Sequence, residues 1–268
     1  MDALSTFRLD GKVALVTGGA GILGQKFCAG LAQAGAKVAV VDLELATAQA
    51  AAQLLGDRAW GFGCDVSDPA SVQACVTAVV ERFGAIDILH NNAATKSRDV
   101  RAFFMPFEDY ALETWREVMS VNIDGMFLMA QAVGRMMIAG GRGGSVVQTS
   151  SIYGLVGPDG RIYRGSDYLG GPINTPAVYS ASKAAVIGLT KWLATHWAKD
   201  NIRVNALVPG GVGSGQNSVF GDLYAQRVPM GRMATADEIV DPMLFLASPA
   251  ARYVTGQVLA ADGGWTAW

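Results

Sequence analysis

The 268-residue sequence is poor in the residues that bind metals or form disulfides. It holds only two histidines, His90 and His196, and three cysteines, Cys28, Cys64 and Cys75. Scattered cysteines in odd number are typical of small core residues in a reducing compartment. Neither histidine has other ligands at metal-binding spacing. We therefore predict no metal site and a cytoplasmic location.

Charge and long apolar runs are also scarce. Charged residues make up 16% of the chain and the formal net charge is −2, so no basic surface for nucleic acid or anionic membranes is expected. No apolar run approaches the roughly 20 residues of a membrane span. The first ten residues lack the basic and apolar regions of a signal peptide. These absences favour a soluble protein with a small-molecule substrate.

Short valine-rich runs alternate with helical patterns along the chain. We predict buried strands at residues 12–17, 37–42, 59–64, 86–91, 144–149, 202–208 and 257–261. Helices are predicted at residues 22–34, 45–55, 68–83, 111–139 and 176–199. This alternation favours a single α/β domain over residues 1–268, a doubly wound, seven-stranded parallel sheet of the Rossmann type with helices on both faces.

Three segments predicted as loops follow the carboxyl ends of strands, where ligands of open parallel sheets bind. They cover residues 94–107, 155–176 and 211–228. The third is rich in glycine and polar residues and lacks strong periodicity, so it is a candidate lid. We expect all three to shape a substrate pocket.

A glycine-rich turn, Thr17 to Gly24, joins the first predicted strand to the first helix. Gly18, Gly21 and Gly24 allow a tight turn and close approach of the backbone to a pyrophosphate. The helix that follows offers free N–H groups and the positive end of its dipole. Glycine alone is weak support, because many such turns contain it, but the position on the first strand of an alternating pattern predicts dinucleotide binding.

Asp42, at the end of the second predicted strand, indicates which dinucleotide is bound. A carboxylate there can accept hydrogen bonds from the adenosine ribose and repels a 2′-phosphate. The next residues, Leu43 and Glu44, supply no cation for such a phosphate. The sequence thus predicts NAD(H) over NADP(H). The alternative is that Asp42 only caps the next helix.

Tyr179 and Lys183 lie four residues apart in a predicted helix, so their side chains share one face. An ammonium about 4 Å from a phenol favours the phenolate by up to about 4 kcal/mol at an effective dielectric near 20. That is about three pKa units, which would bring the tyrosine towards the range useful for proton transfer. By itself the spacing also fits an ordinary helix pair with an exposed lysine.

Together these motifs resemble the short-chain dehydrogenase/reductase family from residue 12 to residue 264. Asn91-Asn92-Ala93-Ala94, Pro209-Gly210 and Asp262-Gly263-Gly264 are similar to further family elements. The resemblance implies four catalytic residues: Asn122, Ser151, Tyr179 as general acid/base and Lys183. Ser151 is aligned by the glycine three residues after it, and Ser150 is the alternative. The resemblance also implies that Lys183 lowers the pKa of Tyr179.

The same resemblance, with the turn and Asp42, extends the set expected to bind NAD. Besides Tyr179 and Lys183, these residues are Thr17, Gly18, Gly21, Ile22, Leu23, Gly24, Asp42, Leu43, Asp65, Val66, Asn92, Ala93, Pro209, Gly210, Val212 and Ser214.

Several positions depart from the family pattern. Gly21 stands one position early, and Ile22 occupies the usual place of the middle glycine. Ala94 replaces a frequent glycine, and Ser214 stands where a threonine often holds the carboxamide. The gap between Ser151 and Tyr179 is considerably longer than usual. No required chemical group is lost.

Cations and hydrogen-bonding side chains in the predicted loops favour a polar substrate, neutral or anionic, such as a sugar, a sugar phosphate or a sugar acid. The substrate residues expected are Lys96, Ser151, Tyr153, Arg161, Arg164, Tyr179 and Gly211. The charges could instead be solvated loop charges. Three alternatives stay open: a 3-oxoacyl-type reductase, an epimerase or dehydratase that recycles NAD, and a non-catalytic NAD-binding module.

Two predicted helices, at residues 122–139 and 184–197, look too apolar for the surface of a monomer. The family resemblance implies that they pair between subunits. A homo-oligomer, either a dimer or a tetramer, is therefore expected.

Overall fold

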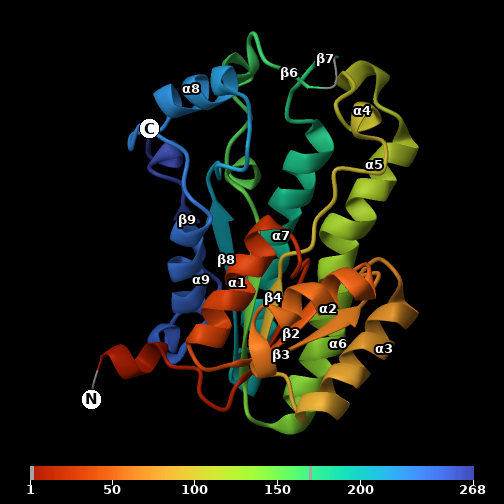
Figure 1. Cartoon of the computed structure of the whole chain (residues 1–268), viewed down its shortest axis with the longest axis vertical. Helices are drawn as coiled ribbons and strands as arrows, with labels where there is room; N and C mark the ends of the chain where they lie inside the picture. The colour runs from red at the N-terminus through yellow and green to blue at the C-terminus, as the bar shows by residue number, and fades with distance from the viewer. Residues whose placement is uncertain (1–2, 169–170) are drawn as a thin grey trace.

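A computed structural model describes residues 3–168 and 171–268 of the chain. Seven parallel strands form the central sheet in the order β3-β2-β1-β4-β5-β8-β9 (Figure 1). Their bounds are β1 Val13–Thr17, β2 Lys37–Asp42, β3 Ala59–Gly63, β4 Ile88–Asn91, β5 Gly144–Thr149, β8 Ile202–Pro209 and β9 Val258–Ala261. The predicted seven-stranded, doubly wound α/β sheet is confirmed.

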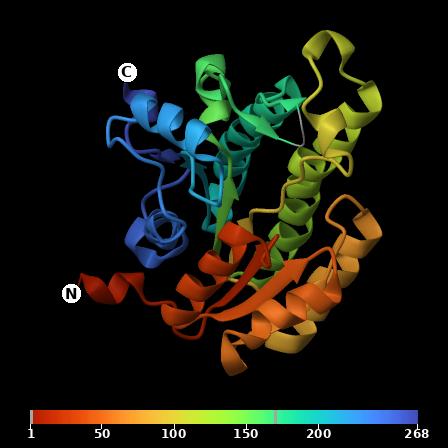
Figure 2. The same cartoon turned by 45° about the horizontal axis from the view of Figure 1, so that its top comes forward.

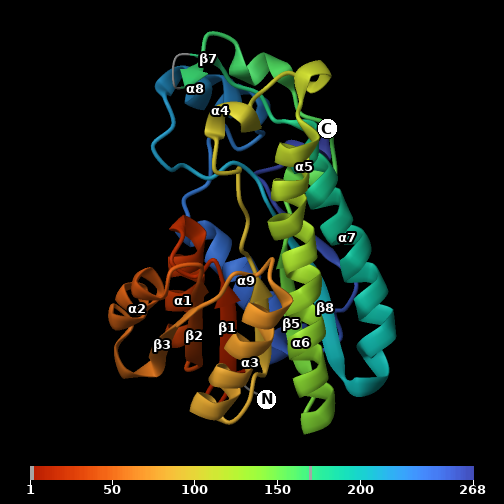
Figure 3. The same ribbon diagram turned by 90° about the vertical axis from the view of Figure 1, so that its right-hand side faces the viewer.

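Helices cover both faces of the sheet. They are α1 Ile22–Gln33, α2 Leu45–Gln53, α3 Pro69–Phe83, α4 Val100–Phe103, α5 Leu112–Met119, α6 Gly125–Gly140, α7 Ala177–Trp197, α8 Ser218–Arg227 and α9 Val240–Ala247. One buried cluster joins α3, α6 and α7 to one face of the sheet, and another joins α1 and α9 to the opposite face. Figure 3 shows α6 and α7 side by side. Because helices cover both faces of the sheet, β1 is buried at every position. Strands buried on both faces have nearly continuous apolar sequences.

The chain order reverses between β1 and β4. Strands β1 to β3 extend to one side, and β4, β5, β8 and β9 extend to the other. Such a switch point opens a crevice at the carboxyl ends of the two central strands, where open α/β sheets bind ligands.

The predicted helix at residues 111–139 is interrupted. α5 and α6 are separated by a π-helical turn, Ser120–Asp124. Asn122 lies in this turn, fully buried, and its Oδ1 accepts the N–H of Thr95 at 2.8 Å. Such turns are frequent at functional sites because they re-aim a side chain within a helix.

The structure corrects the prediction of a loop at residues 211–228, because most of this segment is α8. Asn217 caps the helix, its Oδ1 accepting the N–H of Phe220 at 2.9 Å. Tyr224 is buried in a cluster with Trp265. The contact between Tyr224 and Trp265 joins distant parts of the chain, so the sequence around α8 gives little indication of this helix.

Other elements were not predicted. α9 is almost wholly apolar, and α4 is a single turn. The segment predicted as a loop at residues 155–176 contains a 3-10 turn, Gly160–Tyr163, and a short antiparallel pair, β6 Asp167–Tyr168 with β7 Gly171–Pro172. Leu169 and Gly170 of that segment lie outside the described residues.

Candidate active site

A cleft of about 540 Å³ opens at the switch point. Residues from four strand ends and from the start of α1 line it, and they include most of those predicted to bind NAD. These are Gly18, Gly21, Ile22, Leu23, Gly24, Asp42, Leu43, Asp65, Val66, Asn92 and Ala93. The structure therefore brings together residues that are up to 75 positions apart in the sequence.

Close backbone packing shapes the glycine turn. A Cβ added to Gly24 would lie 2.0 Å from the carbonyl oxygen of Gly18, far inside van der Waals contact. Gly18 has a φ of +61°, which favours glycine. α1 begins after Gly21 and no side chain caps it, so its first N–H groups face the cleft uncapped.

Thr17 ties the end of β1 to the end of β4. Its hydroxyl accepts the N–H groups of Asn92, at 2.9 Å, and Ala93, at 3.1 Å. The Asn92 side chain in turn donates to the Thr17 carbonyl at 3.1 Å. These bonds hold the floor of the cleft rigidly beneath any bound nucleotide.

Asp42 is oriented by backbone donors on both of its oxygens. Oδ2 accepts the N–H of Ala20 at 3.0 Å, and Oδ1 accepts the N–H of Leu43 at 2.9 Å. Each oxygen keeps a further lone pair. The carboxylate lines the cleft and does not cap α2, which has no side-chain cap.

The donor set of this cleft fits a dinucleotide. Uncapped N–H groups suit the pyrophosphate, and the Asp42 carboxylate can accept hydrogen bonds from ribose hydroxyls. Arg98, from the loop after β4, lines the same cleft.

Ser151 lies near enough to Tyr179 to oppose the rise in the pKa of its phenol, although 28 positions separate the two residues in the sequence. The Ser151 hydroxyl also accepts the N–H of Tyr153 at 3.3 Å. The alternative residue, Ser150, is used elsewhere: its hydroxyl donates to the Lys183 carbonyl at 2.7 Å. The geometry therefore favours Ser151 over Ser150 as the partner of the tyrosine.

The pKa of Tyr179 differs from the expectation. It lies above the ordinary value, because burial disfavours the phenolate, while the Ser151 hydrogen bond opposes the shift. The Lys183 ammonium lies 5.8 Å from the centroid of the Tyr179 ring. The expected lowering of this pKa by Lys183 is therefore not found, because the cost of removing the phenolate from water dominates.

Lys183 is held beneath the tyrosine. It is 2% exposed, and its Nζ donates to the Thr149 carbonyl at 3.0 Å. Burial lowers the pKa of this lysine to about 8. Asn122 lies nearby on the same wall, with its Nδ2 donating to Ser182 at 3.4 Å. Ser182 precedes the lysine directly, so the four predicted catalytic residues lie in one region.

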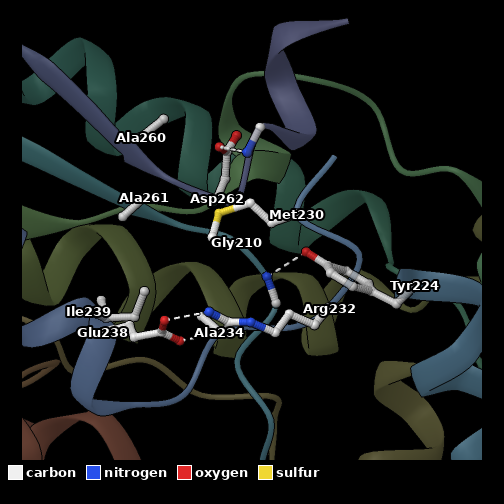
Figure 4. Close-up of a pocket in the computed structure, with 13 residues that line it drawn as sticks. Gly210, Tyr224, Met230, Arg232, Ala234, Glu238, Ile239, Ala260, Ala261 and Asp262 are labelled. Carbon is white, nitrogen blue, oxygen red and sulfur yellow. Dashed lines mark hydrogen bonds and ion pairs between the residues drawn. The ribbon is translucent and has the colours of Figure 1, made fainter. Parts of the chain in front are cut away.

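The end of β8 faces a second cavity, of about 520 Å³ (Figure 4). The Tyr224 hydroxyl accepts the N–H of Gly211, and Arg232 pairs with Glu238 at 2.6 Å. A Cβ on Gly211 would lie 2.4 Å from the Tyr224 ring. Gly211, predicted to contact substrate, therefore packs directly on α8.

Four other residues predicted to bind NAD, Pro209, Gly210, Val212 and Ser214, lie at or just after the end of β8. Val212 forms a parallel bridge with Ala234, and Gly210 lines the second cavity. Ser214 is exposed, and its hydroxyl accepts a hydrogen bond from Gln216 at 2.9 Å. The cleft lining described above does not include these four residues.

The cations predicted to bind substrate lie at the surface. Lys96, Arg161 and Arg164 are all exposed. Arg161 pairs with Asp159 through two short contacts, at 2.8 and 2.6 Å, and its side chain is 69% exposed. Arg161 is thus paired with a neighbouring carboxylate at the surface, as expected if the charges of this loop are solvated and do not bind substrate.

Two residues near the site were not assigned to it from the sequence. Tyr163 lies close enough to raise the pKa of Tyr179 further, and its hydroxyl bonds that of Thr175. Both residues belong to the long segment before α7. Their only sequence signal is their place in a segment longer than the family usually has.

The strand order and the cleft at the switch point are those of a Rossmann-type, nucleotide-binding fold. A family model described as enoyl-(acyl carrier protein) reductase matches residues 19–266. A D-threitol dehydrogenase from Mycolicibacterium smegmatis is 41% identical over 268 residues, covering 97% of this chain and 95% of the relative. The chain belongs to the short-chain dehydrogenase/reductase family and is an oxidoreductase.

Two solved structures have the same fold over nearly the whole chain. A gluconate 5-dehydrogenase from Burkholderia cenocepacia, in complex with NADP and tartrate, has a TM-score of 0.86 at 35% identity and covers 99% of each chain. A short-chain dehydrogenase from Leptospira borgpetersenii with bound NAD+ also has a TM-score of 0.86, at 33% identity, and covers 99% of this chain and 96% of the other. Since their cofactors differ, family membership leaves the choice of cofactor open.

Within residues 3–168 and 171–268, no helix has both the length and the apolar character needed to cross a membrane.

Proposed function

We propose that this protein is an NAD(H)-dependent oxidoreductase that interconverts a secondary alcohol and a ketone on a polar small molecule, a sugar or a sugar derivative. One observation carries the proposal. The buried Lys183 ammonium lies 5.8 Å from the centroid of the Tyr179 ring, with Ser151 near the same tyrosine, in a chain whose cleft suits a dinucleotide. The relative named as a threitol dehydrogenase supports the substrate class.

In the oxidative direction, Tyr179 takes the proton from the substrate hydroxyl. Ser151 hydrogen-bonds the same oxygen and sets its position relative to the phenol. Bound NAD supplies the hydride acceptor and a positive charge beside the phenol. Because burial raises the pKa of Tyr179, positive charge near this residue is needed to favour the phenolate. Lys183 supplies such charge when it is protonated, and Asn122 positions the wall that holds Lys183.

A substrate screen tests this function. Purified enzyme is incubated with NAD and a library of polyols, sugars and hydroxy acids, and NADH is followed by absorbance. We expect turnover of at least one polyol or sugar. If every secondary alcohol in the library is left unoxidised with either cofactor, the proposal is wrong.

The choice of NAD is proposed from Asp42 and is tested separately. Asp42→Ala removes the acceptor for the ribose hydroxyls and the repulsion of a 2′-phosphate. We expect a fall of at least about tenfold in the ratio of kcat/KM for NAD to that for NADP, equivalent to about 1.4 kcal/mol. Glu44→Ala, which changes a nearby exposed carboxylate, is the matched control. An unchanged ratio for Asp42→Ala would rule out this role.

The description of the matching family model favours one alternative, a reductase of acyl thioesters. Asp42 and the polar segment before α7 count against it. Reduction of a 3-oxoacyl thioester with a higher kcat/KM than that of any polyol or sugar would establish the alternative. Tightly retained NAD in the purified protein would instead favour an epimerase or a dehydratase, and cofactor binding without any turnover would favour a sensor.

We also propose that the protein forms a homo-oligomer through α6 and α7. An apolar groove between these helices is lined by Phe127, Ile138, Leu189 and Trp192, and Phe127 and Trp192 are 47% and 60% exposed. Isolated subunits rarely leave such a patch uncovered. Light scattering after size exclusion is expected to give a dimer or a tetramer, and Trp192→Glu should weaken it. A monomeric wild type would exclude this interface.

A cytoplasmic location is proposed from the three cysteines, all of which are buried and free. Fractionation that finds the protein in the cell envelope or the medium would contradict it.

A further inference from the structure

A compact group of three hydroxyls lies above the catalytic residues. The Tyr163 hydroxyl is 3.4 Å from that of Tyr153 and forms a short hydrogen bond with Thr175. We call these three side chains the hydroxyl cluster. Two of them belong to the insert, defined here as residues 155–176.

Aromatic packing fixes the cluster in place. The Tyr163 ring stacks on Phe220 of α8, with centroids 5.5 Å apart and planes 20° from parallel. The Tyr153 ring meets Trp265 edge-on at 6.5 Å. Figure 2 shows α8 beside the insert at one end of the molecule. Rings held in this way present their hydroxyls without a large loss of side-chain entropy.

The cluster is connected to both reacting side chains. The N–H of Tyr153 donates to the Ser151 hydroxyl at 3.3 Å. Thr175 directly precedes Pro176, whose carbonyl accepts the N–H of Tyr179 at 3.1 Å. Tyr163 itself lies close enough to Tyr179 to raise the pKa of that phenol. The cluster therefore borders the two side chains between which a substrate carbinol would bind.

The chemistry of the cluster favours neutral hydroxyl groups as ligands. A hydroxyl has one donor and two acceptor positions, so three hydroxyls that bond one another keep unused acceptors. Burial raises the pKa of Tyr153, so its phenol stays neutral at physiological pH. No cationic side chain bonds the cluster within the described residues, since Arg161 and Arg227 both pair with Asp159. A carboxylate bound there would face acceptor oxygens, and no cationic side chain would balance its charge.

We propose that the hydroxyl cluster binds the hydroxyl adjacent to the reacting carbon, so that the substrate is an uncharged polyol rather than a sugar acid. This inference rests on the proposed function and narrows it. Tyr163 is then a specificity-determining residue, because its hydroxyl occupies the centre of the cluster.

Two matched pairs of substrates test the proposal with NAD. Sorbitol and gluconate differ in a terminal carboxylate, and 2,3-butanediol and 2-butanol differ in the adjacent hydroxyl. Wild type should have the higher kcat/KM for sorbitol and for the diol. Tyr163→Phe keeps the ring on Phe220 and removes one hydroxyl, so it should lose about tenfold on the diol and under twofold on 2-butanol.

A second variant and a control protect this test from a folding defect. Thr175→Val should show the same selective loss. Tyr253→Phe removes a hydroxyl from a fully exposed residue and should change nothing. Thermal unfolding with and without NAD checks that each variant is folded and binds the cofactor.

The outcomes separate this proposal from the proposed function. Equal effects of Tyr163→Phe on the diol and on 2-butanol, or none on either, overturn the role of the cluster while the oxidoreductase function stands. A higher kcat/KM for gluconate than for sorbitol overturns the neutral substrate. A wild type that oxidises no secondary alcohol with either cofactor refutes the proposed function, and this inference with it.

Discussion

The nucleotide side and the substrate side of this protein are built in different ways. At the glycine turn, single backbone contacts set the shape, such as that between Gly24 and the Gly18 carbonyl. At the insert, aromatic rings from Tyr163, Phe220 and Trp265 meet across large sequence distances. A site shaped by backbone contacts can be recognised as a glycine motif in the sequence. A site shaped by side-chain packing shows no fixed spacing, and only its aromatic residue types are visible in the sequence.

The two sides also differ in how readily substitutions can change their shape. Replacing a residue in the turn forces backbone atoms apart, while the substrate side can change its pocket by exchanging side chains on packed elements. Two solved relatives, one in complex with NADP and tartrate and one with NAD+, share this fold at TM-scores of 0.86. Loops and helices carried by a rigid sheet allow such change.

The largest expected effect lies where the two sides meet. Tyr179→Phe removes the proposed proton acceptor and keeps the ring, so kcat should fall by about 10³-fold or more. NAD affinity, measured by fluorescence titration, should stay nearly unchanged. Substantial remaining turnover would mean that another group moves the proton.

The next effect is specific to the nucleotide side. Gly24→Ala places a Cβ 2.0 Å from the Gly18 carbonyl oxygen, and backbone cannot give way cheaply. We expect a cost of about 3 kcal/mol or more, seen as weakened NAD binding and a lower midpoint of urea unfolding. Gly188→Ala, where a Cβ meets nothing within 4 Å, should be neutral or stabilising. Similar results for both variants would contradict the importance of this contact.

Lys183 links stability to pH. Its pKa is lowered from 10.5 to about 8 in the folded protein, so between these values the unfolded chain binds more protons and stability rises with pH. Below about pH 8 the full penalty, about 3 kcal/mol, is present. Lys183→Met removes it.

Urea unfolding of wild type and Lys183→Met at pH 7 and pH 10 checks this linkage. The stability of the variant relative to wild type should fall by about 2 to 3 kcal/mol from the lower to the higher pH. Groups other than Lys183 titrate in both proteins and cancel in the difference. A difference independent of pH would mean that the lysine is not desolvated.

The smallest effect is expected at the surface of the substrate side. Asp159 pairs with Arg161 and Arg227, and hydrogen bonding to Arg161 holds the pKa of this carboxyl below its usual range. Because the arginines are well solvated, Asp159→Asn should cost less than about 1 kcal/mol in unfolding free energy and leave NAD affinity unchanged. A larger loss would show that this ion pair holds the insert onto α8.

Much of the sheet could be predicted from the sequence. The predicted strands at residues 37–42 and 144–149 coincide with β2 and β5, because continuous apolar runs between turn residues have few other readings. The helix α8 within residues 211–228 could not be predicted, since its buried face is formed by Tyr224 against Trp265 and the insert. The ion pair between Asp159 and Arg227 also escaped prediction, because 68 positions separate the two residues.

The sequence by itself determined the order of strands and helices, the glycine turn, and the helical spacing of Tyr179 and Lys183. Each depends on atoms that are near one another along the chain. Only the tertiary structure decided that Ser151 rather than Ser150 reaches the tyrosine, that burial raises the pKa of Tyr179, and that Tyr163 stands beside it. Hydrogen-bond partners and desolvation depend on what surrounds a group in space, and distant parts of the chain supply those surroundings.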